Sequence, residues 1–238
     1  MIKMKRIFFY FFILVSLNLI FILGCKHDYN NTIHYSNQGP NVTDIDGNVY
    51  KSVVIGTQTW MSENLKVLHY RNGDIIPNIA DSIEWNNLAT GAYCYYNNDP
   101  INYNVYGSLY NWYAVKDSRN IAPIGWHVPT NAEWLILTNY LGGESLAGGK
   151  LKETGTSHWI SPNTGADNSS GFTGLPGGYR IGDVVTFGQI GEQGGWWSSS
   201  EGSNIQDGLF LSIMTSFKFA NSYGNPKRFG YSVRCVKD

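Results

Sequence analysis

The sequence predicts a single α+β domain with two helices and short, mostly antiparallel strands. Its 238 residues include 27 Gly, 8 Trp, 16 Tyr and 11 Phe but only 15% charged residues, a composition typical of short aromatic strands joined by tight turns. Apolar residues recur with helical spacing in two segments, near residues 105–117 and 130–141. Residues 44–238 contain no internal repeat and no change of composition, so we expect them to form one domain.

Residues 1–24 are typical of a lipoprotein signal peptide. Lys3, Lys5 and Arg6 precede an apolar run over residues 7–23, and the run ends in ILGC, whose last residue is Cys25. This tetrapeptide resembles the bacterial lipobox, in which the cysteine is acylated and becomes the new N-terminus. A membrane-spanning anchor is the alternative, but the run lies at the lower edge of the roughly 17–25 residues that cross a bilayer, and no cluster of cations follows.

Residues 25–43 are polar and rich in asparagine, so we expect a flexible tether that joins the lipidated Cys25 to the domain. The lipid makes a membrane the first expected partner. Part of the basic charge lies in the leader, and the chain has 18 acidic residues against 17 basic ones, so the mature protein is acidic. We therefore expect no nucleic-acid partner, because the basic footprint of such proteins is absent.

Residues 42–61 predict a β-hairpin. Two alternating stretches flank Asp46-Gly47, a dipeptide favoured in type I′ hairpin turns. The segment also begins like a calcium loop, but Val49 stands where loop position six requires glycine, and Ile55 stands where position twelve requires glutamate. The pattern therefore favours a hairpin over a calcium site.

Residues 90–117 predict an aromatic strand, a turn and a helix that begins near Val105. Tyr106, Leu109, Tyr110 and Tyr113 fall on one face of this helix. Such a stripe is more typical of a buried core than of a ligand platform.

The second helix has a clear start and end. Thr130 and Glu133 have the spacing of a capping box, and Gly142-Gly143 follows the apolar run WLILTNYL. Glu133 is therefore interpreted as structural rather than catalytic. His127 precedes the cap and lacks the spacing of a metal-binding pair on a helix, so we expect a hydrogen-bonded histidine beside Trp126 and no metal site.

The remainder of the chain predicts at least four short strands separated by glycine-rich turns, within residues 171–180, 194–201, 208–219 and 229–236. Two cysteines remain once Cys25 is assigned to the lipid. Cys94 and Cys235 could form a disulfide, which an oxidising compartment favours, or stay as two buried thiols. The sequence favours the disulfide slightly.

Six segments occur in an order that resembles the Fibrobacter succinogenes major paralogous domain. They are DIDGNVYKSVVIGTQTWMSENL, YGSLYNWYAV, PIGWHVPTNAEW, GFTGLPGGYR, WWSSSE and GYSVRCVKD, and together they reach from residue 44 to residue 238. The resemblance implies a bacterial cell-envelope protein, commonly a lipoprotein of Bacteroidetes and Fibrobacteres, of undefined molecular function. It also implies an outer-membrane lipoprotein exposed at the cell surface.

This family is similar to the C-type-lectin-like fold, including formylglycine-generating-enzyme-type domains. In those relatives a P-T-x-A-E-W segment opens a helix and a G-[FY]-x-x-R strand ends the domain, and the matching positions are Thr130, Glu133, Trp134, Tyr231 and Arg234. The resemblance therefore implies a C-type-lectin-like domain. Fold analogy alone does not carry function with it.

The main functional hypothesis is a non-catalytic binding or adhesion module, with glycans as candidate ligands. Trp159, Trp196 and Trp197 lie in glycine-flanked segments, and an exposed indole can stack on a sugar ring. The alternative is that these rings fill the core. Because adjacent strand residues point to opposite faces, we expect one ring of the Trp196-Trp197 pair to face outward.

Two other function classes compete with this hypothesis. Structural or assembly work at the envelope needs a broad protein interface rather than an aromatic pocket. Catalysis is less favoured, because Ser198, Ser199 and Ser200 lack a G-x-S-x-G elbow and Cys235 lacks the nearby second cysteine on which formylglycine-generating relatives depend. We predict no catalytic residue, no cofactor and no obligatory metal.

Overall fold

The computed structural model describes residues 37–182 and 187–238. Over these ranges the helices are α1 (Ser82–Asn86), α2 (Pro100–Tyr106), α3 (Trp112–Lys116), α4 (Asn131–Tyr140) and α5 (Glu144–Leu151), with a 3-10 turn η1 at Tyr96–Asn98. None of these helices has the length and apolar character needed to span a membrane. Cys25 and the predicted leader and tether up to residue 36 lie outside the described residues.

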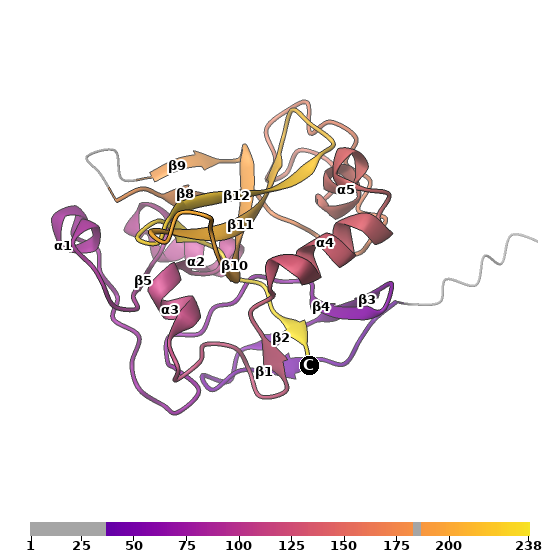
Figure 1. Ribbon diagram of the computed structural model, residues 1–238. Coiled ribbons are helices and arrows are strands. Elements are labelled where there is room, and N and C mark those ends of the chain that lie inside the picture. Colours follow the sequence, from indigo (N-terminus) through magenta and orange to yellow (C-terminus); the bar gives the residue numbers. More distant parts are fainter. Residues whose placement is uncertain (1–36, 183–186) are drawn as a thin grey trace, which may run out of the picture. The chain divides into compact units, whose positions relative to one another are not determined.

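Strands precede, separate and follow the helices along the chain (Figure 1). They are β1 (Val42–Thr43), β2 (Val49–Tyr50), β3 (Ser52–Ile55), β4 (Gln58–Met61), β5 (Tyr93–Cys94), β6 (Leu109–Asn111), β7 (Trp126–His127), β8 (Gly177–Arg180), β9 (Phe187–Ile190), β10 (Gln193–Glu201), β11 (Asp207–Met214), β12 (Ala220–Pro226), β13 (Gly230–Tyr231) and β14 (Val236–Lys237). This confirms a mixed α+β architecture.

The strands form four sheets with the orders β1-β2, β3-β4-β14-β7, β5-β6-β13-β8-β9 and β10-β11-β12. Every pairing between these strands is antiparallel, as the sequence predicts. In the second sheet β14 lies between β4 and β7, so the last strand of the chain closes a sheet that the early hairpin β3-β4 begins.

The first predicted hairpin is confirmed as β1-β2, with Val42 opposite Tyr50. Its loop is held from inside by the Asp44 carboxylate, which accepts hydrogen bonds from the N–H groups of Asp46 and Asn48, each at 3.0 Å. The positive φ of 82° falls on Gly47, where glycine carries no steric penalty.

The predicted second helix is confirmed as α4. The Thr130 hydroxyl accepts the Glu133 N–H at 3.3 Å, and the Glu133 carboxylate accepts the Thr130 N–H at 2.7 Å, which completes the capping box. Gly142 and Gly143 follow with positive φ and end the helix.

The predicted helix over residues 105–117 is wrong. Gly107, with φ 76°, ends α2, and Leu109–Asn111 then forms strand β6 between β5 and β13. Asn111 starts α3, because its side-chain oxygen accepts the Ala114 N–H at 3.0 Å. Pairing with distant strands therefore overrides the helical spacing of the tyrosines. Helices α1 and α5 were not predicted either.

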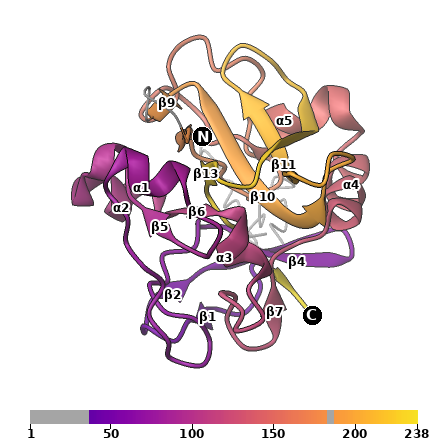
Figure 2. The same ribbon diagram turned by 60° about the vertical axis from the view of Figure 1, so that its left-hand side comes forward.

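The sheet β10-β11-β12 has side chains of separate hydrophobic clusters on its two faces. On one face Trp196 and Leu211, which are paired across the strands, join the side chains of α4 and α5. On the other face Trp197 and Phe210 join Trp112 of α3. Figures 1 and 2 show α4 and α5 to one side of this sheet and α3 to the other.

Candidate functional site

The three tryptophans predicted to bind a ligand are buried, so this prediction is wrong. Trp159 is 1% exposed, and Trp196 and Trp197 are each 0% exposed. Each indole N–H is also bonded inside the protein, to the Gly174 carbonyl at 3.0 Å, to the Asn64 side-chain oxygen at 2.8 Å and to the Tyr110 carbonyl at 2.7 Å, respectively. These rings cannot stack on a sugar.

The expectation that one ring of the Trp196-Trp197 pair faces outward also fails. The two rings do point to opposite faces of β10, as a strand requires. Because α4 and α5 cover one face and α3 covers the other, both rings are enclosed. The error lies in assuming that one face of this strand meets water.

Cys94 and Cys235 are free and buried, so the predicted disulfide is wrong. Cys94 belongs to the cluster around Trp85 and Leu109, whereas Cys235 belongs to the large cluster around Trp126. Each thiol fills space in a different part of the core. Burial raises the pKa of the Cys94 thiol to about 11, so this group stays protonated and unreactive at neutral pH.

His127 is hydrogen-bonded, as the sequence predicts, and its partners are two carboxylates. The distances are 2.7 Å from Nε2 to Glu133 and 2.6 Å from Nδ1 to Asp238. Partial burial opposes the charged form, but the bonds to Asp238 and Glu133 outweigh it and raise the pKa of His127. A ring that donates both N–H groups to carboxylates has no free nitrogen for proton transfer. Its role is instead structural, because its two hydrogen bonds connect β7 to α4 and to Asp238.

The His127 ring also borders an open cavity of about 290 Å³, together with Lys116, Asp117 and Ser199. No hydrogen bond joins Ser199 to His127 among the described residues, so a nucleophile and base pair is not assembled there. His158 bonds Glu153 through Nδ1 at 2.8 Å, but it does not line this cavity. The described residues contain no group of three His, Cys, Asp or Glu placed to hold a metal ion.

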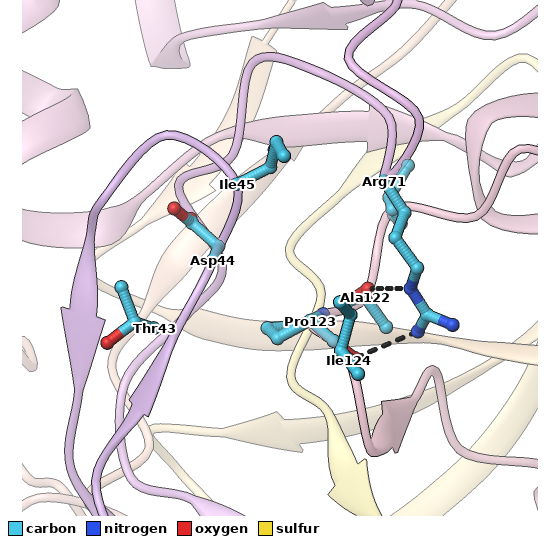
Figure 3. Close-up of a pocket in the computed structure, with 8 residues that line it drawn as sticks. Thr43, Asp44, Ile45, Arg71, Ala122, Pro123 and Ile124 are labelled. Atoms are coloured by element: carbon cyan, nitrogen blue, oxygen red, sulfur yellow. Dashed lines mark hydrogen bonds between the residues drawn. The ribbon is translucent and has the colours of Figure 1, made fainter.

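A second cavity, of about 260 Å³, lies between the β1-β2 loop and residues 121–124 (Figure 3). Its walls are mostly apolar and include Ile45, Ile121, Pro123 and Ile124. Its volume is below the roughly 300–1,000 Å³ of typical ligand pockets.

The polar groups of this apolar cavity are already used. Arg71 donates hydrogen bonds to the carbonyls of Ala122, Pro123 and Trp126 at 2.8–3.0 Å, two of which are drawn in Figure 3. Asp44 accepts the bonds that hold the β1-β2 loop and a further one from Tyr50 at 2.5 Å. These side chains shape the loops and leave no free group to orient a ligand.

A third cavity, of about 420 Å³, falls within the typical range for ligands, and we call it the amide cavity. Four carboxamides line it: Asn86, Asn87, Asn204 and Gln206. The half-buried ring of Tyr113 and three charged side chains, those of Asp207, Lys227 and Arg228, complete the polar lining.

Most of these groups are free to bind. Within the part of the chain that the structure describes, no intramolecular hydrogen bond engages the side chains of Asn86, Gln206 and Asp207 or the hydroxyl of Tyr113. Three side chains are exceptions. Asn87 donates to the Ile83 carbonyl at 2.9 Å, Lys227 pairs with Glu201 at 2.8 Å, and the Asn204 side-chain oxygen accepts the Gln206 N–H at 3.1 Å. The amide cavity therefore combines several unused donors and acceptors.

Residues of the amide cavity come from four segments that are distant in sequence: the end of α1, helix α3, the β10-β11 turn and the loop after β12. Sequence reasoning missed them because asparagine-rich turns are expected between strands in any case. The sequence signal for this site is the presence of several carboxamide residues in loops, together with Arg228. This signal is weak unless the fold shows that the loops meet.

The motifs that carry the family resemblance lie in the core instead. Asn64 accepts hydrogen bonds from Trp196 at 2.8 Å and from Arg234 at 2.8 Å, and all three side chains are buried. Arg234 also stacks on Phe172, with 4.1 Å between its guanidinium carbon and the ring centre. The segments that carry the family resemblance therefore supply core contacts. The carboxamides of the amide cavity belong to residues outside these segments.

Comparison with known proteins identifies the family of this chain. The model of the Fibrobacter succinogenes major domain matches residues 53–237, which is most of the chain. No curated protein and no solved structure matches the chain. The protein described above is therefore a member of the Fibrobacter succinogenes major domain family.

Proposed function

We propose that this protein is a lipid-anchored component of the bacterial cell envelope whose folded domain is a non-catalytic binding module for glycans. The amide cavity is the observation that carries the proposal. Carboxamides both donate and accept hydrogen bonds, as sugar hydroxyls do, and the cavity adds a free carboxylate and an aromatic ring. Its volume lies within the range of typical ligand pockets.

Lipid anchoring through Cys25 and an outer-membrane location support the same role, since they would present the cavity outside the cytosol. The ILGC tetrapeptide and the apolar leader are the grounds for this part. Labelling cells with radioactive palmitate tests it. We expect label in the wild-type protein and none in Cys25→Ala; label in both, or a wild-type protein found among cytoplasmic contents, would contradict the anchor.

The distant C-type-lectin-like relationship is also a proposal. Thr130, Glu133 and Trp134 open α4, and Tyr231 and Arg234 lie near the chain end, in the order that the relationship expects. An experimental structure of this protein that superimposes on no C-type-lectin-like domain would overturn it.

Glycan binding is tested with the detergent-extracted full chain on an array of envelope and plant polysaccharides. We expect binding that Tyr113→Ala and Gln206→Ala each weaken by about tenfold, because each removes one or two contacts to the sugar. Asn139→Ala, which changes an exposed carboxamide on α4, serves as the control and should bind normally. If the wild-type protein binds no polysaccharide on the array, the glycan proposal is wrong and a structural or assembly role is favoured. Crosslinking in intact cells would then test that role.

A further inference from the structure

The arginines of the described residues differ sharply in how their charge is used. Arg71 and Arg180 each donate to three backbone carbonyls. Arg119 pairs with Asp74 and Asp117, and Arg234 is bonded to Asn64 and the Phe172 carbonyl. The Arg228 side chain has no hydrogen bond or ion pair to any described residue, and its Nε is buried without a partner among them.

The backbone that presents Arg228 is held firmly. The Arg228 carbonyl accepts the Trp85 indole N–H at 2.7 Å, and the adjoining Lys227 carbonyl accepts the Trp112 N–H at 2.8 Å. The Lys227 N–H in turn donates to the Gln206 carbonyl at 3.0 Å. Arg228 is therefore a guanidinium on a fixed loop rather than a solvated surface charge, and a fixed loop lowers the entropy cost of binding.

With Glu201 included, the charged groups of the amide cavity sum to zero, but one unpaired guanidinium beside one carboxylate favours a ligand with a single negative charge and several hydroxyl groups. Lys227 is paired with Glu201, 2.8 Å away, so within residues 37–182 and 187–238 Arg228 is the unpaired cation of the cavity and Asp207 its unpaired carboxylate. Asp207 can accept bonds from hydroxyl groups but would repel a doubly charged phosphate. A carboxylate matches the planar guanidinium fork through two parallel hydrogen bonds.

We infer that the amide cavity binds an acidic saccharide, with the carboxylate of a uronic acid unit paired to Arg228 and the sugar hydroxyls bonded to Asp207 and the carboxamides. This inference rests on the proposed glycan-binding function and names its ligand class. A neutral sugar would lack the charge-assisted, bidentate hydrogen bonds that a carboxylate can make to the guanidinium of Arg228.

The test is calorimetric titration of the detergent-extracted full chain with oligogalacturonate and with alginate oligosaccharide, each beside its carboxyl-reduced counterpart. We expect binding of at least one acidic probe and binding at least about tenfold weaker of its reduced form, the usual effect of losing a charged hydrogen bond. Arg228→Gln should weaken the acidic probe to the level of the reduced one. Arg228→Lys should restore only part of the affinity, because lysine keeps the charge and loses the fork.

Arg119→Gln is the matched control, since Arg119 is an exposed arginine outside the cavity. It should leave the affinity unchanged. Equal binding of acidic and reduced probes, or an acidic probe indifferent to Arg228→Gln, would overturn the inference and leave the glycan proposal intact. Failure of every saccharide to bind would overturn both.

Discussion

Buried positive charges in this domain are held by carbonyl oxygens and aromatic rings. Lys152 is 0% exposed, and its ammonium donates to the carbonyls of Thr164 and Phe217, each at 2.9 Å. Arg180 and Arg234, also 0% exposed, bond to carbonyls and lie over the rings of aromatic side chains. A charge buried in this way is costly when its partner is lost.

Asn64→Ala is expected to lower the free energy of unfolding by about 3–5 kcal/mol, because it leaves the Arg234 guanidinium and the Trp196 indole without their shared acceptor. Urea unfolding followed by tryptophan fluorescence measures the loss. The control is Asn139→Ala on the exposed side of α4, which should change stability by less than about 0.5 kcal/mol. Similar losses in both variants would contradict the role assigned to Asn64.

The His127 cluster predicts a pH-dependent contribution to stability. The pKa of His127 is raised above its ordinary 6.5, so its contribution is complete below pH 6.5 and is lost as the pH rises through the raised value. Partial burial opposes the charge of Glu133, but bonds from Thr130 and His127 outweigh it and lower its pKa from 4.5. The contribution of Glu133 is therefore complete above pH 4.5 and lost at lower pH.

The stability difference between the wild type and His127→Gln should thus be largest between pH 4.5 and pH 6.5 and should shrink above that window. Urea unfolding of both proteins at a series of pH values measures it. A difference that grows steadily towards pH 9 would show that the ring is not held as a cation.

Elements defined by local chemistry were predictable from the sequence, and those defined by distant partners were not. The capping box of α4 involves residues three positions apart, so the spacing of Thr130 and Glu133 predicts it from the sequence alone. The tyrosine spacing near residue 106 also looked helical, but β6 forms there because strands β5 and β13 lie beside it. For the same reason the burial of Trp197 and the assembly of the amide cavity could not be read from local pattern.

Helix α5 illustrates how packing overrides helix propensity. Gly148 and Gly149 lie inside it, where glycine ordinarily costs about 1 kcal/mol relative to alanine. A Cβ on Gly148 would collide with the Phe219 carbonyl, and one on Gly149 with the Gly165 carbonyl. The absent side chains allow the helix to pack directly against two loops.

Gly148→Ala should therefore destabilise the protein by about 1–3 kcal/mol despite the better helix propensity of alanine. Thermal and urea unfolding measure the change. Ser145→Ala, at an exposed position of the same helix, is the matched control and should be neutral or slightly stabilising. If Gly148→Ala stabilises the protein, the close packing of α5 is not present in solution.

The whole molecule is stabilised by apolar clusters on the two faces of the β10-β11-β12 sheet, without a disulfide between Cys94 and Cys235. Burial of large aromatic side chains contributes much of this stabilisation. The carboxamides of the amide cavity lie around this core, outside the six segments that carry the family resemblance, whereas Tyr113 belongs to one of those segments.

Reductant should leave the melting temperature unchanged, because the two cysteines are free thiols. Iodoacetamide should label neither Cys94 nor Cys235 in the native protein and should label both after unfolding, since each thiol is buried and Cys94 has a raised pKa. Mass spectrometry measures the labelling. A lower melting temperature in dithiothreitol, or blocked thiols after unfolding without reductant, would contradict the structure.

The position of β14 between β4 and β7 has a kinetic consequence. Val236 pairs with Trp60 and with His127, so this sheet joins segments from opposite ends of the domain. Such non-local pairing raises the contact order and slows folding. Until β14 docks, β4 and β7 each expose an edge of unpaired backbone. Neighbouring chains can pair with these edges during folding, whereas in the folded domain β14 covers them.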